Sequence, residues 1–177
     1  MTTNTCYIGL GSNLGDPVEN LRVAIDRLQN LEQTELVCHS GFYQSPPWGR
    51  TYQPDFVNAV AALDTHLKAG DFLERLLALE NAMGRQRNDD KWGPRIIDLD
   101  VLIFGDELHS SDMLTVPHPL MHERAFVLVP LIDIAPDCEI PGKGRADFFL
   151  QQLGPEVIGS VVPIQANAEA FTKEKAP

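Results

Sequence analysis

The chain has 177 residues, of which 44% are hydrophobic and 22% are charged. This balance is typical of one globular domain with a sizeable core. Asp and Glu total 25 against 14 Lys and Arg, so the formal net charge is -11. Such a charge argues against general binding to nucleic acid or to an anionic membrane surface, and any phosphate site must be built from local cations.

Cysteine usage and the apolar runs indicate the compartment. The three cysteines lie far apart and lack the spacing of a zinc site or a redox pair: Cys6, Cys38 and Cys138. We expect reduced thiols in a cytoplasmic protein. Residues 1–15 lack the pattern of a signal peptide, and no apolar run approaches the roughly 18 residues of a membrane span. One domain is expected over residues 1–160, and a flexible tail over residues 161–177, where Ala, Glu and Lys accumulate.

The first part of the chain predicts a strand, a helix and a second strand. Residues 5–10 form a short β-prone run, and the Gly-rich segment 11–15 turns the chain. Asp16 and Pro17 are typical of a helix start. Residues 35–43 are predicted to form the second strand. The Gly-rich segment lacks the ending of a Walker loop and the spacing of a dinucleotide loop, so we assign it only a turning role.

The next elements predict the fold class. Residues 56–63 and 96–104 have strand patterns, and residues 70–83 between them have apolar positions at helical spacing. The order β-α-β-β-α-β is that of a ferredoxin-like α+β sandwich, with helices covering one face of the sheet. The apolar run 126–134, interrupted by Pro130, predicts a broken helix on the end of the domain, within additional C-terminal helical segments.

Two acidic residues interrupt the apolar fourth strand. Asp98 and Asp100 lie two residues apart, so both carboxylates point to one face, with Cα atoms roughly 6.5 to 7 Å apart. The alternate residues are expected to face the other way: Ile97, Leu99, Val101 and Ile103. Two solvated acids would explain the pair, but like charges on a partly buried face favour a bound cation. Oxygen ligands without nearby His or Cys favour Mg²⁺.

A basic cluster precedes this strand: Arg85, Arg87, Lys91 and Arg95. A solvated loop is the simpler interpretation, and Asp89 and Asp90 within the cluster favour it. Arg95 differs, because it lies just before the acidic strand and its planar guanidinium suits bidentate contact with phosphate. The cations and the two carboxylates together indicate a phosphate-binding site.

The third strand predicts a different type of site. Phe56, Asn58 and Val60 share one face, and an aromatic plane beside an amide suits a flat heteroaromatic ring with polar edges. A core Phe beside an Asn that caps the sheet edge is the alternative. Glu80 lies on the buried stripe of the second helix, where a donor-rich ligand would suit its carboxylate. His118, between two prolines, is either an ordinary loop residue or a hydrogen-bond donor to phosphate.

Five motifs, taken in chain order, resemble the 6-hydroxymethyl-7,8-dihydropterin pyrophosphokinase family of folate biosynthesis over about residues 5–140. They are GSNLG, FYQSPPWG, QPDFVN, WGPRIIDLD and VPHP, at residues 11–15, 42–49, 53–58, 92–100 and 116–119. The resemblance implies a ferredoxin-like fold, two Mg²⁺ ions and ATP as co-substrate. It also implies transfer of pyrophosphate from MgATP to the hydroxymethyl group of the pterin, with release of AMP.

The resemblance implies roles for individual residues. Asp98 and Asp100 match the Mg²⁺ ligands of the family, and they are expected to be catalytic together with the phosphate-engaging Arg85 and Arg95. The expected pterin pocket comprises Ser45, Pro46, Trp48, Phe56, Asn58 and Phe126, with the ring between Phe56 and Phe126. The expected ATP site comprises Glu80, Arg87, Trp92, Arg95, Thr115, His118 and Arg124.

Three positions depart from the family pattern. Phe56 stands where some relatives have Tyr, Leu77 where a Gln can contact the nucleotide, and Met113 where a basic residue can occur. No side chain is clearly placed as a general base, so coordination to Mg²⁺ is expected to acidify the substrate hydroxyl.

Two other functions compete with this one. A non-enzymatic ferredoxin-like sensor of small molecules would explain the fold and the aromatic site, but not the acidic pair beside Arg95. An ordinary kinase would move the γ-phosphate and release ADP. The expected partners are ATP and the pterin, with neither nucleic acid nor membrane, and the expected state is a monomer.

Overall fold

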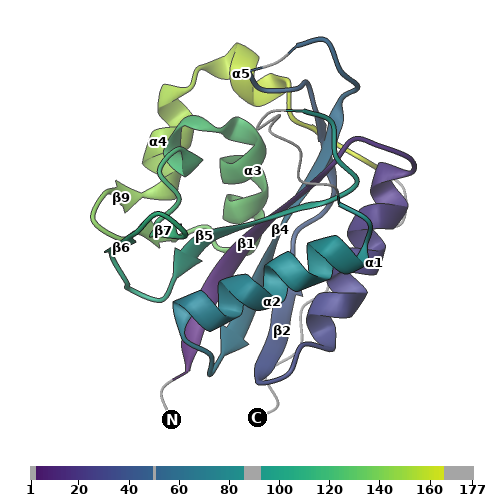
Figure 1. Ribbon diagram of the computed structural model, residues 1–177. Helices are drawn as coiled ribbons and strands as arrows, with labels where there is room; N and C mark the ends of the chain where they lie inside the picture. Colours follow the sequence, from purple (N-terminus) through teal and green to yellow (C-terminus); the bar gives the residue numbers. More distant parts are fainter. Residues whose placement is uncertain (1–2, 50, 86–92, 166–177) are drawn as a thin grey trace.

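The computed structural model describes residues 3–49, 51–85 and 93–165. Within this part of the chain, a six-stranded antiparallel sheet forms the centre of the molecule (Figure 1). Its strands are β1 (Asn4–Ser12), β2 (Thr34–His39), β3 (Tyr43–Ser45), β4 (Phe56–Thr65), β5 (Asp98–Phe104) and β10 (Val162–Pro163). The order across the sheet is β10-β3-β4-β1-β5, and β2 also pairs with β4.

The strand predicted over residues 35–43 is two strands, and this prediction is wrong at its centre. Strands β2 and β3 pair with different parts of β4, and Ser40 lies between them. The backbone N–H of Ser40 donates to the carbonyl of Val60, and the Ser40 hydroxyl accepts from the N–H of Val60 at 3.0 Å. Because a side chain takes one place in the ladder, the chain can bend there without leaving a buried N–H unpaired.

Two helices cover one face of the sheet, α1 (Pro17–Gln29) and α2 (Ala69–Ala82). The carboxylate of Asp16 accepts from the N–H of Glu19 at 3.1 Å, and Pro17 occupies the first turn of α1, as predicted. Both helices bury an apolar stripe against the sheet. The stripe residues are Leu21, Ala24, Ile25 and Leu28 in α1, and Phe72, Leu76 and Leu79 in α2.

The prediction that these two helices cover one face is confirmed, but the C-terminal segment, expected on the end of the domain, covers the other face of the sheet. The chain there forms η1 (Met121–Glu123), α3 (Ala125–Ile134), α4 (Ala146–Gln152) and α5 (Pro155–Gly159). Helix α3 runs unbroken through Pro130 and packs on β4 and α4 (Figure 1). Pro130 removes one backbone hydrogen bond, but burial of Val127, Leu128 and Leu131 holds the helix in place.

A bulge between β1 and β5 changes the face of one predicted residue. Tyr7 pairs with Ile103 and Ile8 pairs with Val101, so Leu102 is an extra residue on β5. Ile103 therefore packs into the core beneath α3, and its predicted place beside Leu99 is wrong. The carboxylate face at residues 98–100 lies before the bulge and keeps the predicted alternation.

The C-terminal part extends the fold past the expected boundary at residue 160. Strand β10 pairs with β3, and the N–H of Ile164 donates to the carbonyl of Phe42 at 2.8 Å. Residues 166–177 of the expected tail lie outside the described residues. Two hairpins complete the fold, β6 (His109–Ser110) with β7 (Thr115–Val116) and β8 (Glu139–Ile140) with β9 (Gly144–Arg145). Of the helices in the described ranges, none is long and apolar enough to cross a membrane.

Candidate active site

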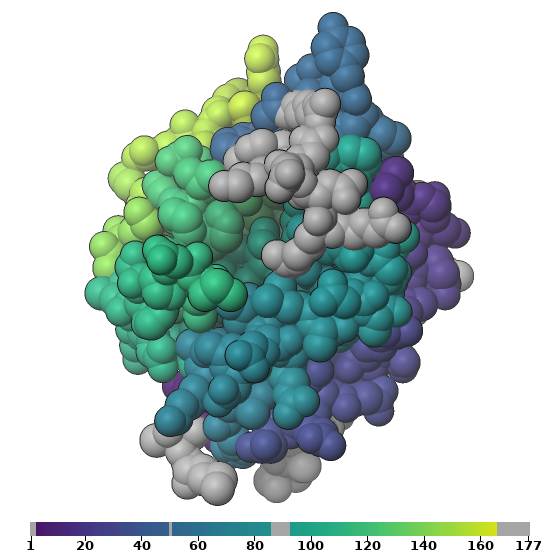
Figure 2. Space-filling view, in the orientation of Figure 1, coloured from purple at the N-terminus to yellow at the C-terminus, as the bar shows by residue number. Residues whose placement is uncertain are grey.

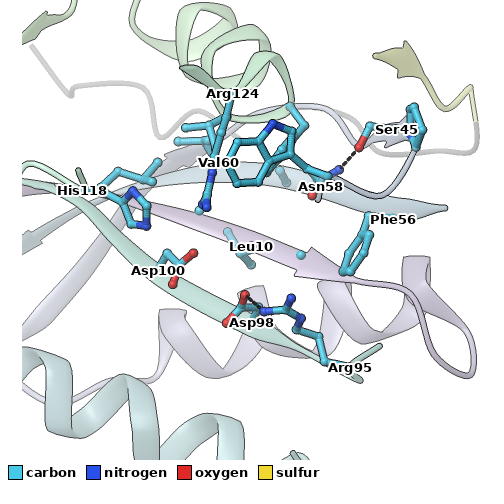
Figure 3. A pocket seen from close by; sticks show the side chains of 18 of the residues that line it. Leu10, Ser45, Phe56, Asn58, Val60, Arg95, Asp98, Asp100, His118 and Arg124 are labelled. Atoms are coloured by element: carbon cyan, nitrogen blue, oxygen red, sulfur yellow. Dashed lines mark hydrogen bonds and ion pairs between the residues drawn. The ribbon is translucent and has the colours of Figure 1, made fainter. Parts of the chain in front are cut away.

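A cavity of about 630 Å³ lies between β1, β4, β5 and the start of α3. The molecular surface is hollowed between the green and teal parts of the chain, which include α3 and β5 (Figure 2). Figure 3 shows most of the side chains that line the cavity, with Asp98 and Asp100 on one side of β1 and Asn58 and Ser45 on the other. The predicted site residues in its lining are Ser45, Pro46, Trp48, Phe56, Asn58, Arg85, Arg95, Asp98, Asp100, His118, Arg124 and Phe126. Segments distant in the sequence therefore meet at one site.

Two predicted residues in the described part of the chain, Thr115 and Glu80, are not in this lining. Thr115 is half-buried in the short strand β7. Glu80 is fully buried beneath the cavity. Arg87 and Trp92 lie outside the described residues. Their assignment to the nucleotide remains a prediction.

The acidic end of the cavity is organised around Asp98. One of its carboxylate oxygens accepts a hydrogen bond from Arg85, and the other accepts from Arg95 (Figure 3 shows the latter). These side chains are about four-fifths buried, which strengthens each pair relative to a surface ion pair. Asp98 thus holds both guanidinium groups at one end of the cavity.

Glu80 supports this arrangement from below. Its Oε1 accepts from the backbone N–H of Leu99 at 2.7 Å and also from the guanidinium of Arg85. The sequence predicts a donor-rich ligand for this buried acid, and in the structure an arginine and a backbone N–H are donors to it. Glu80 therefore contacts Arg85 and the backbone of β5, and its position is fixed by the packing of α2 against β5.

Asp100 differs from Asp98 in its electrostatics. Burial, and after it the charge of Asp98, raise the pKa of Asp100 to about 7, although Arg124 and Arg95 act in the opposite direction. A negative charge on Asp100 is therefore unfavourable at this buried position, and a divalent cation beside it would stabilise that charge. In the described ranges, no group of three His, Cys, Asp or Glu could hold a metal by itself. A two-carboxylate site leaves the other positions for water and phosphate, as Mg²⁺ prefers.

His118 is a neutral hydrogen-bonding group at this end. Burial, and after it the charge of Arg124, lower its pKa to about 4, although the charge of Asp98 acts in the opposite direction. Its Nδ1 accepts from the N–H of Leu120 at 3.1 Å. The proton of the neutral ring therefore sits on Nε2, which can donate to an anionic ligand.

The other end of the cavity combines an amide with aromatic rings. Asn58 Nδ2 donates to the hydroxyl of Ser45 at 2.9 Å, and both side chains are buried (Figure 3). Phe56 lies two residues before Asn58 on the same face of β4. Trp48 is 39% exposed. This end suits a flat ring with polar edges, as the sequence predicts.

Guanidinium groups contact the aromatic rings. The central carbon of Arg124 lies 4.6 Å from the centroid of the Trp48 ring and 5.7 Å from that of Phe126. The corresponding distance from Arg95 to Phe56 is 5.5 Å. Arg95 therefore contacts both the acidic end and the aromatic end, and these contacts could not be inferred from sequence spacing.

Sequence reasoning missed the contribution of the Gly-rich segment. Asn13 is 3% exposed, and its Oδ1 accepts from the N–H of Arg95 at 2.8 Å. Its Nδ2 donates to Gln53 Oε1 and to the carbonyl of Pro54, both at 3.0 Å. One asparagine thus joins the segment before the acidic strand to the segment before β4. Gly11, two residues earlier, lines the cavity itself, and strand alternation opposite Asp98 could have indicated it.

Comparisons with known proteins agree with one another. The sequence profile of the 7,8-dihydro-6-hydroxymethylpterin-pyrophosphokinase (HPPK) family matches residues 7–136. A 2-amino-4-hydroxy-6-hydroxymethyldihydropteridine pyrophosphokinase of Pseudomonas aeruginosa is 50% identical over 135 residues, which cover 76% of this chain and 83% of that protein. One of the same name from Haemophilus influenzae is 47% identical over 137 residues, covering 77% and 85%.

A solved structure has a similar fold. It is Plasmodium falciparum HPPK-DHPS with pteroate, with a TM-score of 0.66 and 13% sequence identity. The alignment covers 85% of this chain and 42% of that one. At this identity the similarity supports the mixed α/β architecture with its antiparallel sheet.

Proposed function

The chain belongs to the 7,8-dihydro-6-hydroxymethylpterin-pyrophosphokinase family, and we propose that its cavity is where pyrophosphate passes from ATP to 6-hydroxymethyl-7,8-dihydropterin in folate biosynthesis. One observation carries the proposal. A single cavity combines a buried amide and aromatic rings at one end with two carboxylates and two arginines at the other. This arrangement suits a bicyclic heterocycle whose hydroxymethyl group must meet a triphosphate.

We assign the acidic end to Mg²⁺ and phosphate. Asp98 and Asp100 would hold two Mg²⁺ ions together with oxygens of ATP, and the raised pKa of Asp100 supports a cation there. When bound, Mg²⁺ supplies charge neutralisation of the triphosphate and acidification of the hydroxyl. Arg85 and Arg95, already placed by Asp98, would stabilise charge on the moving group.

The reaction forms a bond between the hydroxymethyl oxygen and the β-phosphorus of ATP. The bond between the β-phosphorus and the oxygen that bridges to the α-phosphorus breaks, AMP leaves, and the hydroxyl proton goes to water. Arg95 lies near both groups, because it contacts Asp98 and the Phe56 ring. We therefore propose that Arg95 stabilises the charge on the pyrophosphoryl group as it passes from ATP to the pterin.

We assign the other end to the pterin. Asn58 would form hydrogen bonds with the polar edge of the ring, and Ser45 fixes the orientation of the Asn58 amide. Phe56 and Phe126 would cover the two faces of the ring, and Pro46 and Trp48 would complete the pocket. The arginines that contact Phe56 and Phe126 would move aside as the ring enters.

The nucleotide side is assigned to Arg87, Trp92, Arg95, Thr115, His118 and Arg124. His118 Nε2 and the guanidinium of Arg124 line the cavity near the carboxylates, which supports phosphate contact. For Glu80 we propose a positioning role through Arg85 and Leu99 in place of direct contact.

We further propose a ferredoxin-like topology, a monomeric state and a cytoplasmic location. The strand order β5-β1-β4-β2 with α1 and α2 on one face supports the topology. Free cysteines in the described residues, Cys6, Cys38 and Cys138, are consistent with a reducing compartment.

The test is the nucleotide product. The protein is incubated with ATP, Mg²⁺ and 6-hydroxymethyl-7,8-dihydropterin, and AMP and ADP are separated by chromatography. We expect AMP in equal amount to the pyrophosphorylated pterin, and no AMP when the pterin is left out. Release of ADP would indicate an ordinary kinase, and absence of both would indicate a binding protein; either result would contradict the proposal.

A further inference from the structure

Gly11 lies between the two ends of the cavity. On β1 it pairs with Asn58 of β4 on one side and with Asp98 of β5 on the other. Paired residues of antiparallel strands point to the same face, so these three positions form one row across the sheet. Neighbouring strands are about 4.8 Å apart, which places the backbones of Asn58 and Asp98 roughly 10 Å from each other. Gly11 lines the cavity, and its backbone lies between the two.

A side chain at Gly11 would meet the amide that faces the ring site. A Cβ built there would lie 3.3 Å from Asn58 Oδ1 and 3.8 Å from Cδ1 of Phe56. Asn58 has little freedom to withdraw, because its Nδ2 donates to the Ser45 hydroxyl at 2.9 Å and both residues are buried. Even a methyl group would therefore press on the hydrogen-bonding edge of the pocket.

The backbone conformation does not require glycine at this position. Gly15 and Gly105 have φ of +67° and +51°, whereas Gly11 is not among the residues with positive φ. Glycine inside a strand is unfavourable for stability, and it often marks a close approach of a ligand. Close approach of a ligand would therefore explain why this central strand has glycine at residue 11 despite its lower stability.

We propose that Gly11 is a specificity-determining residue of this site. Its missing side chain leaves an open path over β1, so that a planar bicyclic substrate can contact Asn58 while its one-carbon arm reaches the carboxylates of Asp98 and Asp100. A substrate with a fixed length between ring edge and hydroxyl is selected, because both ends must be reached across one bare strand. This inference rests on the proposed function.

The test compares Gly11→Ala with the unchanged protein. Binding of 6-hydroxymethyl-7,8-dihydropterin is measured by calorimetry in the presence of α,β-methylene ATP and Mg²⁺, which prevents turnover. We expect the pterin Kd to rise at least about tenfold. The affinity for the ATP analogue should stay within about twofold. The variant should remain folded, because the restriction that Ala places on the unfolded chain offsets part of the crowding at Asn58.

Gly70→Ala is the matched control, since a Cβ at Gly70 on helix α2 meets nothing within 4 Å. It should bind the pterin as the unchanged protein does. Normal pterin binding by Gly11→Ala would overturn the inference, and so would unfolding of this variant, because glycine would then serve the sheet. If the unchanged protein forms AMP and Gly11→Ala does so with an unaltered KM, only this inference fails. If the unchanged protein forms no AMP, the proposed function fails first.

Discussion

The carboxylate of Glu80 reaches from α2 to β5, where its Oε1 accepts a hydrogen bond of 2.7 Å from the N–H of Leu99. Leu99 is the residue between the two cavity aspartates, and the same oxygen accepts from Arg85. One buried acid therefore holds both the strand that carries the two cavity aspartates and the guanidinium of Arg85 at the acidic end. The position of these groups depends on a helix that does not line the cavity.

Replacing Glu80 should affect both stability and turnover. Glu80→Ala leaves the N–H of Leu99 without its partner and removes one anion beside Arg85, so we expect a loss of about 1–3 kcal/mol in the free energy of unfolding. Glu80→Gln keeps an acceptor and should lose less stability, yet it should still lower AMP release. Urea unfolding and the AMP assay measure the two effects. Glu74→Ala, an exposed position on the same helix, is the control, and a Glu80→Ala variant as stable as this control would refute the prediction.

The raised pKa of Asp100 predicts an unusual pH dependence in metal-free protein. Its pKa is about 7 when folded and near 3.8 when unfolded. Between these values the folded state keeps a proton that the unfolded state has released. The proton held by folded Asp100 therefore adds to the free energy of unfolding at low pH. This added stability is lost as the pH rises to about 7.

Asp100→Asn should remove that dependence. With a chelator present, lowering the pH from 8 to 5 should raise the free energy of unfolding of the unchanged protein relative to the variant. At pH 8 the variant should be the more stable of the two, because it lacks one of two neighbouring charges. Chemical denaturation at both pH values measures the difference. Asp106→Asn, at an exposed site beyond β5, should have the same pH dependence of stability as the unchanged protein. The same pH dependence in all three proteins would contradict the raised pKa of Asp100.

Much of the site could be predicted from local patterns. Alternation along residues 96–101 placed Asp98 and Asp100 on one face, and the same reasoning placed Phe56 with Asn58 on β4. The partner of Glu80 could not be predicted, since it depends on how α2 lies across β5.

The errors in the fold arose from tertiary contacts. The Ser40 hydroxyl entered the ladder and divided a predicted strand, and a bulge moved Ile103 to the other face. Burial against β4 kept α3 helical through Pro130, although local sequence rules predict a break there. In each case a contact between distant segments outweighed the local preference.

Asn13 provides a test of how the two loops of the site are joined. Asn13→Ala removes the acceptor for the N–H of Arg95 and both donors to Gln53 and Pro54. We expect about 1–3 kcal/mol less stability, because the part-buried N–H of Arg95 and carbonyl of Pro54 lose their partner. We also expect turnover to fall at saturating substrate, because one of the two hydrogen bonds between Asn13 and the Arg95 backbone is lost and Arg95 is positioned less firmly.

Asn13→Asp separates these contributions, since it keeps the acceptor for Arg95 but loses the donors. It should retain more turnover than Asn13→Ala. Steady-state kinetics with AMP as the product give kcat and KM for both variants, and the exposed Asn81→Ala on α2 is the control. Equal kcat values for Asn13→Ala and the unchanged protein would show that Arg95 is held by other contacts.

The last prediction concerns recognition of the ring. Asn58 can use its Oδ1 for a ligand while its Nδ2 is held by Ser45, and truncating it would leave polar atoms of a buried ligand unpaired. Each such atom costs ~1–3 kcal/mol. Asn58→Ala should thus weaken pterin binding by roughly tenfold or more, at about 1.4 kcal/mol per factor of ten. The affinity for α,β-methylene ATP with Mg²⁺ should be unchanged, because the acidic end of the cavity is separated from Asn58 by strand β1.

Ser45→Ala tests the second half of this argument. It leaves the Asn58 amide in place without its anchor, so its loss of pterin affinity should be smaller than that of Asn58→Ala. Because the two residues are joined by one hydrogen bond, the double variant should lose less affinity than the sum of the single losses. Calorimetry on the three variants, with the exposed Asn30→Ala as control, gives the coupling. Normal pterin binding by Asn58→Ala, or strict additivity of the two losses, would show that Ser45 and Asn58 do not act together in binding the ring.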